Sequence, residues 1–191
     1  LLFEEDTTTN GYRIVVDKLL KEPHLELVLF ESLKGYGFTA WEDIKKLLHA
    51  QSGKKVVSPT HTVLKNREHI LVYPNAAAEE TTEYIIQEKA KHLSLTNGIL
   101  HIEKKTLNKQ EETSALSIYI DNDSVEYPLV VRKWQKGDYF YPTGMQGKKK
   151  LSKYFKDEKY ALPEKENTWL LCSKNEIIWV IGKRADRRFQ S

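Results

Sequence analysis

The hydrophobic pattern of this 191-residue chain changes its period near Gly53, and that change limits the folds open to it. Before it, Leu25, Leu29 and Leu33 recur every four residues, which predicts a helix over residues 23–36. After it, short β-branched runs alternate with turn residues, a pattern typical of antiparallel strands. The sequence therefore predicts an α+β protein, with helices near its start and sheet further on.

Residues 1–75 are predicted to form a small module of two helices and a β-meander. The second helix is expected to begin after Thr39 and to end near Gly53, because Thr39 and Glu42 have the spacing of a capping box. The three strands of the meander are predicted at residues 55–58, 61–65 and 69–73.

The rest of the chain is predicted to contain a linker at residues 76–90 and, at residues 91–191, a basic β-rich C-terminal domain with a short basic helix. The linker is placed there because residues 75–82 are poor in bulky apolar side chains and have turn character. Strands of the domain are predicted at residues 98–107, 115–120, 128–133, 168–172 and 176–181, the last two joined as a hairpin.

Composition places the chain among proteins with packed cores, since 40% of its residues are hydrophobic and 10% are aromatic. Its apolar runs of about five residues fall far short of the ~20 that a membrane-spanning helix needs. The single cysteine, Cys172, cannot form an internal disulfide, and its apolar neighbours predict a buried, unreactive thiol. These features are those of a cytoplasmic protein, and the start at Leu1 without an initiator methionine indicates a piece of a longer one.

Charge is distributed unevenly along the chain. Residues 132–191 carry 15 Lys and Arg against 7 Asp and Glu, which gives 15 − 7 = +8, whereas residues 1–131 give 15 − 20 = −5. A concentrated positive block favours a phosphate-rich partner, because each cation near a phosphate releases condensed counterions. A solvated lysine-rich surface is the alternative that charge alone leaves open.

No constellation of catalytic or metal-binding residues is recognisable in the sequence. The six histidines are scattered, and none has the spacing of a metal site. Gly147 and Lys148 resemble the end of a phosphate-binding P-loop, but the preceding glycine is too close and the following Ser or Thr is missing. We therefore predict no catalytic residue, no cofactor-binding residue and no metal ligand in this chain.

Three consecutive lysines at positions 148–150 form the amino end of a short helix predicted over residues 148–156, with Leu151, Tyr154 and Phe155 on its buried face. Cations at the amino end of a helix are unfavourable unless an anion binds there, in which case the helix end and the lysines cooperate. The alternative is a tight glycine turn with solvated lysines.

Aromatic residues are interleaved with these charges. Trp134 and Phe140 are expected in the core, whereas Tyr139 and Tyr141 could lie exposed and stack on bases or sugars. Asp138 is expected to accept hydrogen bonds from a turn or an arginine rather than to act in catalysis.

Several short motifs resemble the C-terminal region of bacterial tRNA(Ile)-lysidine synthetase. The motifs of its last domain are Val131-Arg132, Gly137-Asp138, Pro142-x-Gly144-Met145-x-Gly147-Lys148-Lys149-Lys150-Leu151, Phe155-x-Asp157 and Ile178-Trp179-Val180-x-Gly182-x-Arg184. Those of its helical substrate-binding module are Tyr36-Gly37-Phe38, Ser52-Gly53-Lys54, Ser58-Pro59-Thr60-His61 and Asn66-Arg67. Together they span most of the chain apart from residues 75–115. One departure is Tyr139, where the family often has an arginine, which argues against a phosphate contact at that position.

The resemblance implies that this chain is the tRNA-binding part of an ATP-dependent ligase. In that family an N-terminal domain with a Ser-Gly-Gly-x-Asp-Ser loop uses ATP and Mg to adenylate the wobble cytidine of tRNA(Ile) with a CAU anticodon, and lysine then displaces AMP. That loop is absent here, so the chain alone is expected to be inactive and to hold no cofactor. Its implied partners are the tRNA, held at the acceptor stem by the C-terminal domain, and the N-terminal catalytic domain of the parent chain. Neither a membrane nor DNA is expected, and a homodimer is left open.

Basic residues expected to contact tRNA are assigned by motif position and charge: Lys54, Lys55, Arg67, Arg132, Lys148, Lys149, Lys150, Lys153, Arg184 and Arg187. Those of the first module would seat the tRNA near the reacting end, and those of the second would hold a duplex through phosphates and 2′-hydroxyls. Two other hypotheses stay open. A protein-interaction module with a basic aromatic surface predicts binding that depends weakly on salt, and a complete small enzyme would have to bind ATP by itself.

Overall fold

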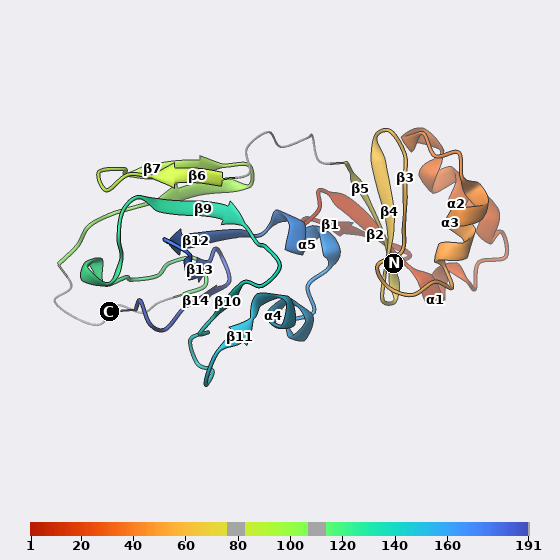
Figure 1. Cartoon of the computed structure of the whole chain (residues 1–191). Coiled ribbons are helices and arrows are strands. Elements are labelled where there is room, and N and C mark those ends of the chain that lie inside the picture. The colour runs from red at the N-terminus through yellow and green to blue at the C-terminus, as the bar shows by residue number, and fades with distance from the viewer. Residues whose placement is uncertain (76–82, 107–113, 191) are drawn as a thin grey trace. The chain divides into compact units, whose positions relative to one another are not determined.

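The computed structural model describes residues 1–75, 83–106 and 114–190, which fall into two compact units (Figure 1). The first unit comprises residues 1–79 and 161–163, and the second comprises residues 80–160 and 164–191. Within the described ranges, no helix is long and apolar enough to cross a membrane. Mixed helix and antiparallel sheet confirm the predicted α+β class.

The first unit is built on a five-stranded antiparallel sheet with the order β1-β2-β5-β4-β3. Its strands are β1 (Phe3–Asp6), β2 (Gly11–Val15), β3 (Lys55–Val57), β4 (His61–Asn66) and β5 (His69–Pro74). The last three are the predicted meander. The first two were not predicted. The acidic run of β1 has little apolar content, and this strand is held by its pairing with β2, where Glu4 lies opposite Arg13 and bonds to it at 2.7 Å.

Short helices α1 (Val16–Leu19), α2 (Leu25–Leu33) and α3 (Trp41–Leu47) complete this unit, with a 3-10 turn, η1 (Lys34–Tyr36), after α2. Leu29 and Leu33 of α2 and Ile44 of α3 share one core with β2, β4 and β5, as the four-residue spacing predicts. The predicted capping box is wrong. The residue that caps α3 is Ala40, and no side chain accepts a hydrogen bond there, because Thr39 lies one residue too early.

The second unit contains a five-stranded antiparallel sheet with the order β14-β13-β12-β9-β6. Its strands are β6 (Glu83–Ile86), β9 (Leu129–Lys133), β12 (Trp169–Ser173), β13 (Glu176–Val180) and β14 (Arg184–Ala185). Two small two-stranded pairs accompany it, β7 (His92–Leu95) with β8 (Gly98–His101) and β10 (Tyr139–Phe140) with β11 (Lys149–Lys150). Its helices are η2 (Asn122–Ser124) and α4 (Leu151–Asp157), while α5 (Leu162–Asn167) belongs in part to each unit, since residues 161–163 are assigned to the first. The predicted hairpin near the end of the chain is confirmed as β12 and β13.

Four expectations for this part of the chain differ from the structure. The basic helix predicted over residues 148–156 begins only at Leu151, because Lys149 and Lys150 form β11 and pair with β10. Of the predicted linker, residues 76–82 lie outside the described residues, but β6 occupies residues 83–86 because it pairs with β9. The strand predicted at residues 98–107 is shorter, since β8 ends at His101. The strand predicted at residues 115–120 does not form; Ile120 makes only an isolated bridge with Gln190, so the alternating pattern lacks a neighbouring strand to pair with.

The central sheet of the second unit is buried on both faces. The elements that carry the basic residues pack against one of these faces and are held there by it. Alternate residues of β12 enter different cores, Trp169 and Leu171 one of them and Leu170 and Cys172 the other. On the second face, α4 and β10 contribute the fully or nearly fully buried side chains Phe140, Leu151, Tyr154 and Phe155. The predicted buried face of the basic helix and the predicted burial of Cys172 are therefore confirmed, while Trp134 is only partly buried.

Candidate nucleic-acid interface

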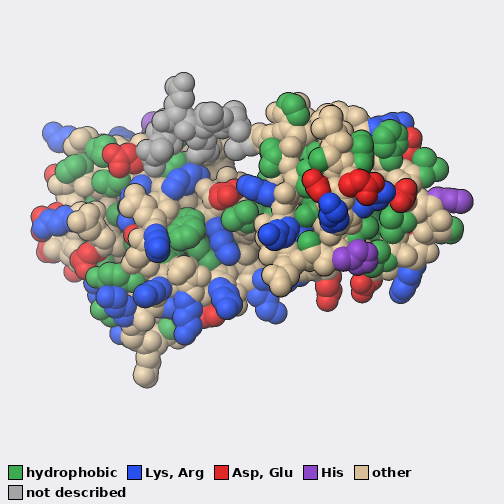
Figure 2. Space-filling model, turned by 45° about the vertical axis from the view of Figure 1, so that its right-hand side comes forward, with side chains coloured by type: hydrophobic (Ala, Val, Ile, Leu, Met, Phe, Trp, Pro, Cys, Tyr) green, Lys and Arg blue, Asp and Glu red, His purple; other side chains and the backbone are tan. Residues whose placement is uncertain are grey.

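Six basic residues lie on β11, α4, β14 and the turns beside them, and we call them the basic surface: Lys148, Lys149, Lys150, Lys153, Arg184 and Arg187. Figure 2 shows Lys and Arg side chains gathered over the lower part of the second unit. Because α4 packs onto the sheet through Leu151, Tyr154 and Phe155, its lysines are left on the outside.

The loop of residues 142–147 lies at the centre of this surface and is tied down by backbone contacts. The Thr143 amide donates to the Ala185 carbonyl at 3.0 Å, and the Met145 amide donates to the Pro142 carbonyl at 3.1 Å. Gly144 and Gly147 both have φ 76°, a left-handed conformation that L side chains rarely adopt. The glycines of the motif are thus required by the path of the loop.

Two arginines are oriented by carbonyl groups of the same loop. Arg184 donates from Nη1 to the Thr143 carbonyl at 3.1 Å, and Arg187 donates from Nη1 to the Met145 carbonyl at 3.2 Å. A guanidinium has five N–H donors, so each arginine keeps further donors for a second acceptor. The loop therefore positions both groups before any anion arrives.

Two of the ten predicted contact residues have acidic partners instead. Arg132 forms a forked pair with Asp138, Nη1 to Oδ2 and Nη2 to Oδ1, both at 2.9 Å, and the hydrogen bonds raise the pKa of Arg132. Lys149 lies 2.9 Å from the Asp157 carboxylate and lowers the pKa of that group. Both ion pairs hold the framework of the surface, and Asp138 has the arginine-accepting role that its position predicted.

The lysines at positions 148, 150 and 153 are exposed, and none forms an ion pair within the described part of the chain. The ammonium of Lys148 lies 3.4 Å from the centroid of the Tyr139 ring, a cation–π contact. Together with Arg187, these lysines are the cations of the surface that are most accessible to an anion.

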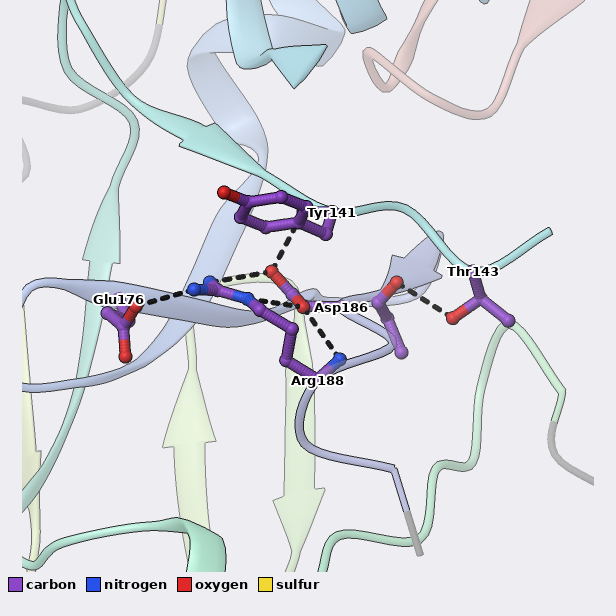
Figure 3. A network of polar contacts seen from close by, with 6 residues as sticks. Tyr141, Thr143, Glu176, Asp186 and Arg188 are labelled. Carbon is purple, nitrogen blue, oxygen red and sulfur yellow. Dashed lines mark hydrogen bonds and ion pairs between the residues drawn. The ribbon is translucent and has the colours of Figure 1, made fainter. Parts of the chain in front are cut away.

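The charged network in Figure 3 adjoins the loop of residues 142–147, because Asp186 forms an isolated bridge with Pro142, and sequence reasoning missed its centre. Asp186 is fully buried and accepts hydrogen bonds from the Tyr141 amide and from the amide, Nε and Nη2 of Arg188. Arg188 also reaches Glu176 at 2.6 Å, and these bonds raise the pKa of Arg188. The signal in the sequence that could have indicated this role is the position of Asp186 inside a basic tail, because an acidic side chain there must be either exposed or paired with a cation.

The predicted residues of the first unit form a separate small group. Lys54 and Lys55 are exposed at the start of β3, and Arg67 is exposed in the turn between β4 and β5. The Arg67 amide donates to Ser52 Oγ, which brings the two turns side by side. The ring of His61 stacks on that of Tyr36, with centroids 4.0 Å apart, and burial lowers the pKa of His61.

Nothing among the described residues forms an evident catalytic centre. No three His, Cys, Asp or Glu side chains lie close enough to hold a metal ion within the described ranges. The Cys172 thiol is buried, which raises its pKa to about 11 and leaves very little thiolate at neutral pH. The exposed lysines and the loop-bound arginines of the basic surface are suited to binding anions.

Comparison with known proteins gives two domain matches within this chain. The profile of the TilS substrate binding domain matches residues 7–75, and that of the TilS substrate C-terminal domain matches residues 129–191. A solved structure, "Crystal structure of TILS C-terminal domain", aligns with 57% of this chain and 85% of that chain, at a TM-score of 0.50 and 25% identity.

Curated relatives with the name tRNA(Ile)-lysidine synthase match along most of the chain. The relative from Parabacteroides distasonis is 39% identical over 97% of this chain and 43% of its own length. The relative from Bacteroides thetaiotaomicron is 37% identical over 96% of this chain and 40% of its own length. The chain thus spans about two fifths of the length of these relatives.

Proposed function

The chain belongs to the tRNA(Ile)-lysidine synthase family and comprises its substrate-binding and C-terminal domains. From this premise we propose that the chain holds the tRNA for a catalytic domain. The observation that carries the proposal is the basic surface, whose exposed cations Lys148, Lys150, Lys153 and Arg187 form no ion pair in the described part of the chain. Unpaired surface cations in such a cluster favour a polyanion.

The second unit holds a double-helical part of the tRNA, which we take to be the acceptor stem. In A-form RNA the major groove is too deep and narrow for side chains, so recognition rests on phosphates, 2′-hydroxyls and shape. A surface whose cations are positioned by a fixed loop is suited to such contacts, whereas Arg132 and Lys149 act through their ion pairs with Asp138 and Asp157.

The first unit seats the tRNA nearer the reacting nucleotide, through Lys54, Lys55 and Arg67. Adenylation of the wobble cytidine with ATP and Mg, and the attack of lysine, belong to a catalytic domain outside this chain. The chain contributes affinity and placement to that reaction in the cytoplasm, and has no ligase activity alone.

The proposal is tested by fluorescence anisotropy of this chain with labelled tRNA(Ile) bearing a CAU anticodon, across a range of salt concentrations. We expect affinity that falls steeply with salt and exceeds the affinity for tRNA(Met) and for double-stranded DNA. Equal affinity for all three would reduce the chain to a non-specific clamp. Absence of binding at low salt would contradict the proposal and favour a protein-interaction module instead.

A further inference from the structure

Two tyrosines present their rings beside the basic surface. Tyr139 and Tyr141 flank Phe140, which is fully buried, so the pleat of the chain turns both tyrosines away from the core. Their ring centroids lie 6.4 Å apart with an interplanar angle of 76°. Tyr139 is 38% exposed, whereas Tyr141 is partly covered.

The cations that cover the two rings are held very differently. The guanidinium of Arg188 lies 4.3 Å from the Tyr141 centroid and is fixed by Asp186 and Glu176 (Figure 3). The ammonium of Lys148 lies over Tyr139, but no ion pair restrains it within the described residues. Tyr141 is therefore part of the framework, while the ring of Tyr139 can be uncovered by rotation of one exposed lysine side chain.

We infer that Tyr139 is a stacking platform for an unpaired RNA nucleotide, an inference that rests on the proposed function and extends it from duplex to single strand. An exposed aromatic ring flanked by cations is the arrangement that single-strand binding sites use, with bases on the rings and phosphates on the charges. Base stacking on a side chain is worth more than an exposed lysine–aromatic contact, so a base can displace Lys148 from the ring.

The neighbouring charges are suited to the phosphates on either side of such a nucleotide. Lys148, once displaced, remains within reach of the strand, and Arg187 is oriented by the Met145 carbonyl with its guanidinium 5.9 Å from the Tyr141 centroid. A continuous duplex cannot use the ring in this way, because its base faces are covered by their neighbours. The ligand class is thus an unpaired nucleotide next to a duplex.

The test compares three RNA hairpins that share one stem: blunt, with a short 3′ overhang, and with the same overhang lacking its bases. Dissociation constants are measured by anisotropy with the whole chain at one salt concentration. We expect wild type to prefer the base-containing overhang over the abasic one by about fivefold or more. Tyr139→Leu should lose this preference and keep its affinity for the blunt hairpin, and Tyr139→Phe should retain it. Phe30→Leu is the matched control, because Phe30 is a similarly exposed ring in the first unit.

Each result decides the inference and separates it from the proposed function. Equal binding of base-containing and abasic overhangs by wild type would overturn the stacking role while leaving duplex binding in place. A preference that survives in Tyr139→Leu would also overturn it, because another group would then carry the stacking. Failure of every hairpin and of the tRNA itself to bind would overturn the proposed function, and the inference with it.

Discussion

Asp186 holds the C-terminal tail in place through a buried charged network. It is fully buried, and its carboxylate satisfies the backbone amides of Tyr141 and Arg188 as well as the Arg188 guanidinium. Removing one partner of a buried charged network leaves the others unpaired, so Asp186→Ala should lower the free energy of unfolding by about 3 kcal/mol. Urea denaturation followed by tryptophan fluorescence measures this change. Asp157→Ala is the control, because it breaks a more exposed ion pair and should cost less than about 1 kcal/mol. Equal losses of stability in the two variants would contradict the stabilising role of the buried Asp186 network.

The thiol of Cys172 is expected to be unreactive in the native protein. Burial raises its pKa to about 11, so at pH 8 the thiolate fraction falls about a hundredfold below that of an ordinary cysteine. Since the raised pKa suppresses the charged form, reactivity should increase as the pH rises toward 11. Labelling with a thiol reagent at pH 8 should therefore be slow in the native state and fast in denaturant. Rapid native labelling would show that the strand around Cys172 opens readily.

At the scale of elements, the start of α3 offers a direct test of the helix-capping geometry. Ala40 occupies the capping position and has no side-chain acceptor, so Ala40→Ser should raise the free energy of unfolding by about 0.5–1 kcal/mol. Thr39→Ala should have almost no effect, because Thr39 makes no capping bond. Thermal or urea unfolding distinguishes the two variants. A loss of stability in Thr39→Ala would instead restore the capping box that the sequence suggested.

Elements with a local signal could be predicted from the sequence. The β12–β13 hairpin, the meander β3–β5 and the buried face of α4 follow from periodicity and turn residues that lie close together in the chain. The elements that were missed depend on distant partners. The acidic strand β1 and the strand β6 form because β2 and β9 offer them an edge, whereas residues 115–120 have a strand-like pattern without such a partner.

The sequence indicates which stretches carry the basic residues, but it does not indicate which of these residues form ion pairs. Motif and charge indicate Arg132 and Lys149 as strongly as Lys150, yet the first two have acidic partners that come from other positions in the fold. Pairing of this kind is a tertiary property, as is the burial of Asp186 among arginine and backbone donors. A sequence shows how many cations a surface can have, and only the fold shows which of them are free.

For the whole molecule, the segregation of charge makes a quantitative prediction about salt. Each phosphate neutralised contributes about −0.7 to −0.9 to the slope of log Kobs against log salt concentration, so the four exposed cations of the basic surface should contribute about −2.8 to −3.6 to that slope. Lys150→Ala should reduce the magnitude of that slope by about 1, because Lys150 is exposed and forms no ion pair in the described part of the chain. The adjacent Lys149→Ala should change it less, because its ammonium is already neutralised by Asp157. Titrations of tRNA(Ile) at several salt concentrations measure both slopes. Equal reductions would mean that the Lys149–Asp157 pair opens on binding, and Lys149 would then be one of the groups that neutralise a phosphate.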